Sequence, residues 1–213
     1  MLFSNPGLIR KIIFYLGTGM LFSSLSYGIY LYYPLGKAVL NYWTYKNEIS
    51  ITPDAPVPVP TVTQTNSTEY SITVPKILAY AKIVENVSPF NAKEYLKVLE
   101  NNVVAQVKGT SEVGGGIGKS TYLFAHSSSQ GIASVRNNSV FYLLGELNNS
   151  DVVFINRFGT IYTYQVYDQK IINANQIEYL KYVDPDREVL ILQTCWPIGT
   201  DWKRLLVFAK RIK

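Results

Sequence analysis

Residues 189–209 read V-L-I-L-Q-T-C-W-P-I-G-T-D-W-K-R-L-L-V-F-A. An apolar run of β-forming residues ends on Cys195, a short turn-like insert follows, and a second apolar run begins directly after Arg204. The pattern predicts two strands whose facing ends hold a thiol and a guanidinium. A nearby cation lowers the pKa of a thiol and yields the nucleophilic thiolate, so Cys195 is the first candidate for chemistry. The alternative is a buried cysteine that only fills space.

The composition indicates contact with lipid and excludes several classes of protein. Hydrophobic residues make up 47% of the 213 residues and charged residues only 16%. The formal net charge of +5 suits an anionic surface such as a membrane or a wall polymer, but no basic block suggests a nucleic-acid partner. A chain with one cysteine cannot form an intramolecular disulfide, and no paired Cys or His pattern indicates a metal site. We therefore expect no metal and no cofactor.

An uncharged stretch near the N-terminus predicts a transmembrane helix. Residues 12–33 lack charged side chains, and a helix of that length spans roughly 30 Å of hydrocarbon. A cleaved signal peptide is the alternative, but its apolar region is usually shorter. Arg10 and Lys11 precede the stretch, which slightly favours a cytoplasmic segment 1–11 with the remainder outside the cell. Aromatic residues gather toward its C-terminal side, as at a membrane interface: Tyr27, Tyr30, Tyr32, Tyr33, Tyr42 and Trp43.

Residues 34–69 are expected to form an extracytoplasmic linker. Between residues 52 and 68 the composition shifts to Pro, Val, Thr, Asn and Ser, with prolines at positions 53, 56, 58 and 60. Such a segment favours extended polyproline conformation and acts as a semi-stiff spacer. An edge segment wrapped on the domain is the alternative. The linker would hold a folded domain, residues 70–213, away from the bilayer.

The domain is predicted to be mainly β. Its β-like runs are 71–74, 81–84, 103–107, 121–125, 152–156, 160–168, 189–194 and 205–210. Asn91 can cap a helix over 92–99 with Glu94 three residues later, and 140–147 reads as a short helix or turn. About eight short strands in one domain favour a closed or nearly closed barrel, which leaves no exposed strand edge.

A glycine-rich stretch, residues 114–118, ends in Lys119-Ser120 and superficially resembles a phosphate-binding loop. The spacing G-x-x-x-x-G-K-[ST] is not met, because Gly114 lies one residue too close to Gly118. A strand pattern follows where the motif requires a helix. We therefore expect a flexible connection into the next strand.

The single histidine, His126, ends the run T-Y-L-F-A-H at the start of a polar loop. Alone, such a histidine is more often an incidental residue. Here a His, a Cys and an Arg each stand at the polar end of a predicted strand. In a Cys-His pair the thiolate attacks a carbonyl, the imidazole protonates the leaving amine, and a donor stabilises the oxyanion. The set predicts acyl-transfer chemistry.

Four segments together resemble a sortase in order and spacing. They are Y-S-I-T-V-P-K-I at 70–77, T-Y-L-F-A-H-S at 121–127, L-Q-T-C at 192–195 and K-R-L-L-V-F-A at 203–209. The resemblance implies a sortase-like eight-stranded β-barrel with short helices, preceded by one N-terminal transmembrane helix. Sortases are membrane-anchored cysteine transpeptidases of bacterial surfaces. They cleave a sorting signal such as L-P-x-T-G between Thr and Gly, then pass the acyl group from a thioester to an amine of a wall precursor or pilin.

The resemblance also implies roles for individual residues. Cys195 matches the nucleophile, His126 the general acid and base, and Arg204 the cation that stabilises the oxyanion and positions substrate. Thr194 matches the threonine before the cysteine, whose hydroxyl is expected to help hold substrate or the oxyanion. Ile191 stands where the family pattern T-L-x-T-C has its first threonine. The T-C-W-P sequence looks closer to class D or E than to class B.

Two rival functions remain compatible with the sequence. One is a surface cysteine peptidase of this fold that only hydrolyses, because no residue decides whether an amine or water takes the acyl group. The other is a catalytically silent, membrane-tethered binding module. Such a module needs only a groove and has no reason to keep the thiol, imidazole and guanidinium together.

Overall fold

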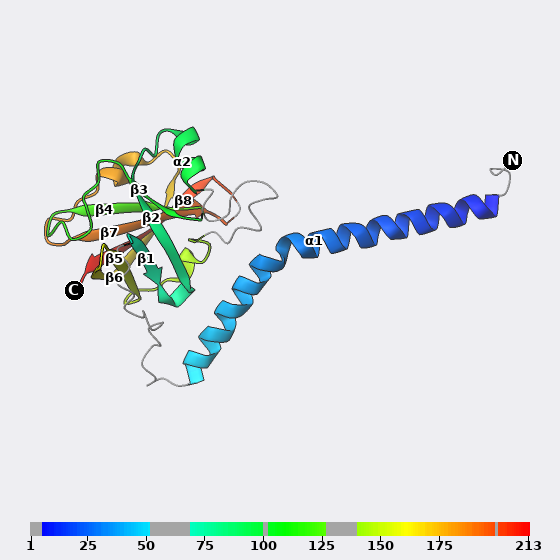
Figure 1. Cartoon of the computed structure of the whole chain (residues 1–213), viewed down its shortest axis with the longest axis horizontal. Helices are drawn as coiled ribbons and strands as arrows, with labels where there is room; N and C mark the ends of the chain where they lie inside the picture. The colour runs from blue at the N-terminus through cyan, green and yellow to red at the C-terminus, as the bar shows by residue number, and fades with distance from the viewer. Residues whose placement is uncertain (1–5, 52–68, 100–101, 127–139, 199) are drawn as a thin grey trace.

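The computed structural model describes residues 6–51, 69–99, 102–126, 140–198 and 200–213. Eight strands close into a barrel in the order β1-β2-β3-β4-β7-β8-β6-β5 (Figure 1), which confirms the predicted fold class. The strands are β1 Ser71–Val74, β2 Ala79–Val87, β3 Val104–Val107, β4 Ser120–Phe124, β5 Val152–Arg157, β6 Thr160–Asn173, β7 Val189–Trp196 and β8 Lys203–Arg211. The helices are α1 Pro6–Ile51 and α2 Ala92–Leu99, with 3-10 turns η1 Pro75–Ile77, η2 Leu144–Glu146 and η3 Ile177–Lys181.

Two strand pairs in the barrel are parallel, β2 with β3 and β4 with β7, and the other pairs are antiparallel. A parallel pair needs a crossover connection, and α2 supplies it between β2 and β3. The predicted cap of this helix is confirmed, since the Glu94 backbone N–H donates to Asn91 Oδ1 at 3.3 Å. The β4–β7 pair sets the C-terminal ends of both strands side by side.

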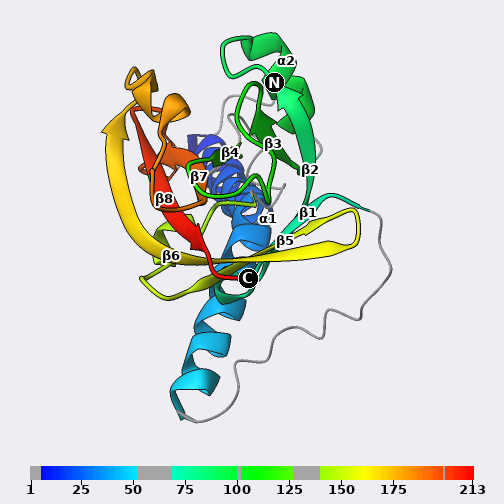
Figure 2. The same ribbon diagram turned by 90° about the vertical axis from the view of Figure 1, so that its left-hand side faces the viewer.

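Strand β6 is longer than the sequence pattern suggested. It runs on from Asp168 to Asn173 and pairs with β5 along its first half and with β8 along its second (Figure 2). The register against β8 shifts between Val166 and Asp168. A bulge of this kind bends and twists a strand, which lets one long strand curve around the barrel wall.

Two hydrophobic clusters lie on opposite sides of the sheet. The first contains buried residues from every strand and therefore fills the barrel interior; examples are Ile72, Leu123, Leu192 and Val207. The second lies on the outer face of β3, β4, β7, β8 and β6; it includes Tyr122, Phe124, Ile191, Leu206 and Phe208. Residues of α2 and η3 pack on this outer cluster. Alternation along each strand separates the two clusters.

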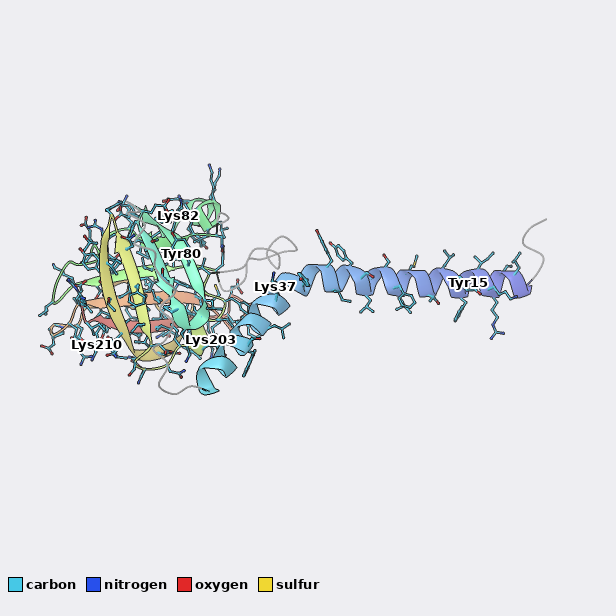
Figure 3. The ribbon with its side chains drawn as sticks, turned by 60° about the horizontal axis from the view of Figure 1, so that its bottom comes forward. Tyr15, Lys37, Tyr80, Lys82, Lys203 and Lys210 are labelled. Atoms are coloured by element: carbon cyan, nitrogen blue, oxygen red, sulfur yellow. The ribbon has the colours of Figure 1, made fainter. Side chains whose placement is uncertain are left out.

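Helix α1 contains an apolar segment, Gly7–Tyr30, that is long enough to cross a membrane, close to the predicted span of 12–33. The helix continues to Ile51, so residues 34–51, expected to be linker, are helical. Figure 3 shows it bending close to Lys37, just after Pro34. Proline lacks the N–H that would complete the helical hydrogen-bond ladder, so it bends a long helix without ending it. The proline-rich stretch 52–68 and residues 1–5 lie outside the described residues.

The glycine-rich connection is held by a buried carboxylate. Glu188 is 5% exposed, and its oxygens accept hydrogen bonds from the Gly114 and Gly116 N–H groups at 2.8 and 3.0 Å. The Tyr164 hydroxyl and Arg211 Nη1 donate to the same carboxylate at 2.6 and 3.0 Å. The loop's amides therefore serve the fold and are not offered to a phosphate. The expectation of a flexible connection does not fit these contacts, because Glu188 holds two of the loop's amides in place.

Glu188→Gln is expected to destabilise the folded domain at neutral pH. Burial alone would raise the pKa of Glu188, but the donors from Tyr164, Arg211 and the loop hold it below its ordinary value. A carboxyl group whose pKa is lower in the folded state than in the unfolded state stabilises the fold at pH values above its unfolded pKa. This stabilisation disappears as the pH falls through the pKa of the folded state. We expect the free energy of unfolding to fall by about 2 kcal/mol at pH 7, and by less below pH 4. Urea unfolding in detergent at the two pH values measures this.

The matched control is Glu112→Gln, which removes an exposed carboxylate paired with Arg157 at 2.8 Å. Exposed ion pairs contribute little to the stability of a fold, so the free energy of unfolding of this variant should be close to that of the wild type. An equal destabilisation by Glu188→Gln at both pH values would contradict the account of the carboxylate.

Candidate active site

Cys195 and Arg204 face each other across two adjacent strands. Cys195 lies next to the end of β7, and the antiparallel register pairs it directly with Arg204, the second residue of β8. Paired residues of neighbouring strands point to the same side of the sheet, with Cβ atoms about 4.5–5.5 Å apart. The predicted pair of strands with a thiol and a guanidinium at facing ends is thus what the structure contains.

His126 follows β4 on the other side of β7. The parallel register pairs Phe124 with Gln193, and the Ala125 N–H donates to the Gln193 carbonyl at 3.1 Å, so the pairing continues past the last strand residue. Continued for two more residues along both strands, this register would bring His126 opposite Cys195. β7 therefore lies in the middle, with the imidazole on one neighbouring strand and the guanidinium on the other.

All three residues belong to the outer face of the barrel wall. On β7, Leu192 is part of the interior cluster. Side chains alternate between the two faces of a strand, so Cys195, three residues further on, points to the outer face. Phe124 and Leu206 belong to the outer cluster, and His126 and Arg204 each lie two residues further toward the same edge. The three functional groups consequently share one face, at the end of the sheet where the outer cluster stops.

Thr194 points the other way. It is 2% exposed, and its hydroxyl donates to the Ala125 carbonyl at 3.2 Å. The expectation that this hydroxyl contacts substrate or the oxyanion does not fit this placement, because the alternation that brings Cys195 outward turns Thr194 inward. Its observed contact joins β7 to the segment that leads into His126.

Burial sets the charge states of the thiol and the imidazole. Burial raises the pKa of Cys195, although Arg204 opposes this shift. The expected lowering of the thiol pKa is therefore wrong for this state, since desolvation of the thiolate outweighs the nearby cation. Burial also lowers the pKa of His126. At neutral pH the resting groups are therefore a neutral thiol on Cys195 and a neutral imidazole on His126.

The guanidinium of Arg204 is held by the connection between β7 and β8. Its Nη1 donates to the carbonyls of Asp201 and Lys203 at 2.7 and 3.0 Å. Nε and Nη2 donate to no other residue among those that the structure describes, so they can donate to another group. A planar guanidinium fixed in this way is suited to two-point donation to an oxyanion or carbonyl.

Two contacts beside the site were not foreseen from the sequence. The Tyr122 hydroxyl donates to Gln193 Oε1 at 2.6 Å on the same outer face as Cys195. On the inner side, Trp196 packs on the interior cluster, and a Cβ added at Gly145 would lie 3.0 Å from its ring. Both contacts join residues far apart in the sequence, so no local pattern reveals them.

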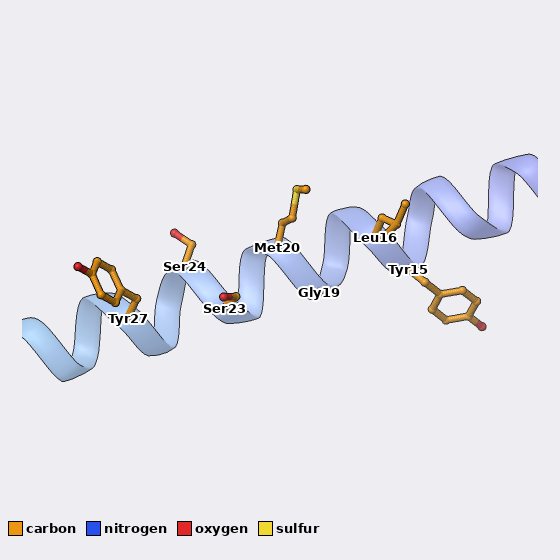
Figure 4. Close-up of a pocket in the computed structure, with 7 residues that line it drawn as sticks. All are labelled: Tyr15, Leu16, Gly19, Met20, Ser23, Ser24 and Tyr27. Atoms are coloured by element: carbon orange, nitrogen blue, oxygen red, sulfur yellow. The ribbon is translucent and has the colours of Figure 1, made fainter.

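Other features of the described chain lie away from Cys195. A groove runs along one side of α1, with its residues drawn in Figure 4: Tyr15, Leu16, Gly19, Met20, Ser23, Ser24 and Tyr27. It belongs to the segment that is long enough to span a membrane. No group of three or more His, Cys, Asp or Glu side chains that could hold a metal ion occurs among the residues that the structure describes.

Comparison with solved structures finds the same barrel in bacterial enzymes. The pilus-related sortase C of Group B Streptococcus is 22% identical, with a TM-score of 0.57 over 84% of this chain and 91% of that chain. Sortase C from Clostridium perfringens SM101 is 22% identical, with a TM-score of 0.52 over 84% and 89%. Sortase A from Corynebacterium diphtheriae is 22% identical, with a TM-score of 0.54 over 68% of this chain and 61% of that chain.

A comparison with curated protein sequences finds no match. The sortase domain family model matches residues 72–212, from β1 to the end of the barrel. The named structures are of types A and C, so the resemblance to class D or E stays a prediction. The match covers the whole barrel, including Cys195, His126 and Arg204. This chain therefore belongs to the sortase family of membrane-associated cysteine transpeptidases.

Proposed function

We propose that this chain cleaves an L-P-x-T-G-like sorting signal with Cys195 and transfers the protein, through a thioester, to an amine of a cell-wall precursor or pilin. The observation that supports this most strongly is the strand register. It pairs Cys195 with Arg204 on one side. On the other side β4 pairs with β7 up to Gln193, and the chain continues from there to His126. The family membership supports the reaction class, and this register supports the choice of residues.

The first half of the reaction forms the acyl-enzyme. Proton transfer from the Cys195 thiol to the His126 imidazole gives a thiolate and an imidazolium. The sulfur attacks the scissile carbonyl carbon, and the carbonyl oxygen becomes an oxyanion that the Arg204 guanidinium stabilises. The carbon–nitrogen bond then breaks, and the imidazolium gives its proton to the departing amine. The products are a thioester on Cys195, a neutral imidazole and the released C-terminal fragment.

The second half reverses these roles. The acceptor amine attacks the thioester carbon while the His126 imidazole takes up a proton from the amine. The carbon–sulfur bond breaks, and the thiolate of Cys195 leaves and is reprotonated. Because water can replace the amine at this step, a hydrolysing peptidase would use the same residues, and only the partition between amine and water separates the two functions.

The N-terminal helix supports a membrane location for this reaction. The segment Gly7–Tyr30 is apolar, and its described side chains are largely exposed, as expected where lipid is the solvent. Arg10 and Lys11 lie at its start, which favours a cytoplasmic N-terminus and a catalytic domain outside the cell. In that orientation the barrel meets exported substrate proteins and wall or pilin acceptors.

A quenched fluorescent library of L-P-x-T-G-type peptides, offered to the full chain in detergent micelles, tests the proposal. We expect cleavage at the signal and, with added amine, a second product in which the amine replaces the C-terminal fragment. Cleavage without any amine product would favour the surface peptidase. Binding of peptides without cleavage would favour the silent module.

Arg204→Lys is expected to lower kcat/KM by about 10²-fold or more, because an ammonium keeps the charge but not the two-point donation to an oxyanion. The kinetics of peptide cleavage measure this, with the thermal midpoint as a check on folding. The matched control is Lys203→Arg on the neighbouring, exposed strand position, which should retain the wild-type rate. A wild-type rate in Arg204→Lys would remove this residue from the mechanism.

A further inference from the structure

The outer face beside Cys195 holds a polar pair in otherwise apolar surroundings. Gln193 precedes Cys195 by two residues on β7, so both side chains point to the same face. Around Gln193 lie Phe124, its register partner on β4, and Leu206, its partner on β8, and both are buried. A substrate segment that extends from Cys195 over β7 therefore meets Gln193 first.

The Tyr122 hydroxyl fixes the orientation of the Gln193 amide. It donates to Gln193 Oε1 at 2.6 Å, and the tyrosine is only 2% exposed. Burial raises the pKa of the Tyr122 phenol well above its ordinary value, against the opposite effect of Arg204. The phenol thus stays protonated and remains a donor throughout the physiological pH range. Because its proton occupies the amide oxygen, the amide nitrogen of Gln193 faces away from Tyr122.

A second Tyr–Gln pair in the barrel shows what a purely structural arrangement looks like. The Tyr70 hydroxyl donates to Gln106 Oε1 at 2.8 Å, and Gln106 Nε2 in turn donates to the Ser111 carbonyl at 3.0 Å. Gln106 is 5% exposed, so both ends of its amide are satisfied within the fold. Gln193 differs on both counts: its side chain is partly exposed, and its Nε2 donates no hydrogen bond to any residue that the structure describes.

We propose that Gln193, held by Tyr122, is a substrate-positioning residue whose amide nitrogen donates a hydrogen bond to a side-chain oxygen of the acyl-donor peptide close to the scissile bond. The inference rests on the proposed function and names a substrate class for the same site. A peptide with an acceptor-bearing residue at that position, such as Asn or Thr, binds better than one with the isosteric Leu or Val. An apolar residue there would bury the Gln193 amide without a partner.

Paired peptides test this directly. Each residue on the N-terminal side of the scissile bond is varied in turn between Leu and Asn and between Val and Thr, and kcat/KM is measured with the full chain in micelles. We expect one position at which the wild type prefers the oxygen-bearing member by about fivefold. The preference is the ratio of kcat/KM for the oxygen-bearing peptide to that for its apolar partner. Gln193→Leu should bring this ratio to one or below, mainly by changing KM, because the variant offers an apolar surface instead of a hydrogen-bond donor.

Two further variants separate positioning from simple support of the fold. Tyr122→Phe keeps the ring but frees the amide to rotate, so it should reduce the ratio while Gln193 is still present. Tyr70→Phe removes the comparable hydrogen bond of the structural pair, and it should lower the thermal midpoint without changing the ratio. A ratio that is unchanged in Gln193→Leu would overturn the inference and leave the proposed function standing. Equal cleavage of both peptides of every pair would also overturn the inference, and it would count against an L-P-x-T-G-like signal as well. No cleavage of any peptide would overturn both.

Discussion

Cys195→Ala is expected to lower peptide cleavage at least about 10³-fold, to the level of the uncatalysed reaction in the assay. Both halves of the proposed reaction pass through a thioester on the sulfur of this residue, and the chain has no second thiol that could replace it. The side chain is only partly buried and small, so the thermal midpoint should change little. Release of fluorescence from the quenched peptide, followed beside a thermal melt, measures both quantities.

The control for this experiment is Cys195→Ser, which keeps nearly the same shape and replaces sulfur by oxygen. A hydroxyl is a far weaker nucleophile than a thiolate at neutral pH, so this variant should fold normally and remain almost inactive. Wild-type cleavage by Cys195→Ala would end the assignment of the nucleophile.

His126→Ala is expected to reduce kcat/KM by about 10²- to 10⁴-fold, the usual contribution of a general acid and base. The imidazole both takes the thiol proton and protonates the leaving amine, and no other histidine exists in the chain. Single-turnover cleavage measures the loss. A rate within a few-fold of the wild type would show that another group moves these protons.

The pH profile of the wild type gives an independent test of the same pair. The pKa of His126 lies below its ordinary 6.5 and that of Cys195 above its ordinary 9.0. Between these values the active thiolate–imidazolium form arises by internal proton transfer, so kcat/KM should be flat across neutral pH. It should fall in acid, where the imidazole is charged and the thiol is not, and in strong base, where the imidazolium is lost. His126→Ala should lack the acid limb; a retained limb would contradict the assignment.

Much of the architecture could be predicted from the β-forming runs and from the residues at their ends. Alternating and continuous apolar segments with turn residues between them predicted eight short strands, and the position of Cys195 and Arg204 at facing ends predicted their pairing. What the runs could not specify is where pairing continues beyond them. Strand β6 extends to Asn173 because β8 offers partners for it, and α1 extends to Ile51 through a proline that ordinarily marks a boundary.

The site shows the same limit at the level of single side chains. His126 was found from its position after an apolar run, but the burial that keeps it and Cys195 neutral depends on neighbours from several strands. Thr194 was expected beside the substrate. Side chains alternate along β7, however, so the outward position of Cys195 makes Thr194 point inward, where it is buried. The Tyr122–Gln193 bond spans 71 residues of sequence, so only the folded barrel brings the two together.

Mass spectrometry of the full-length protein trapped with a sorting-signal peptide tests the central claim most directly. The account predicts a mass increase equal to the acyl fragment, located on the tryptic peptide that contains Cys195 and released by hydroxylamine as expected of a thioester. The adduct should be absent from Cys195→Ala. An acyl group attached to any other residue, or peptide turnover with no covalent adduct under conditions that trap thioesters, would contradict it.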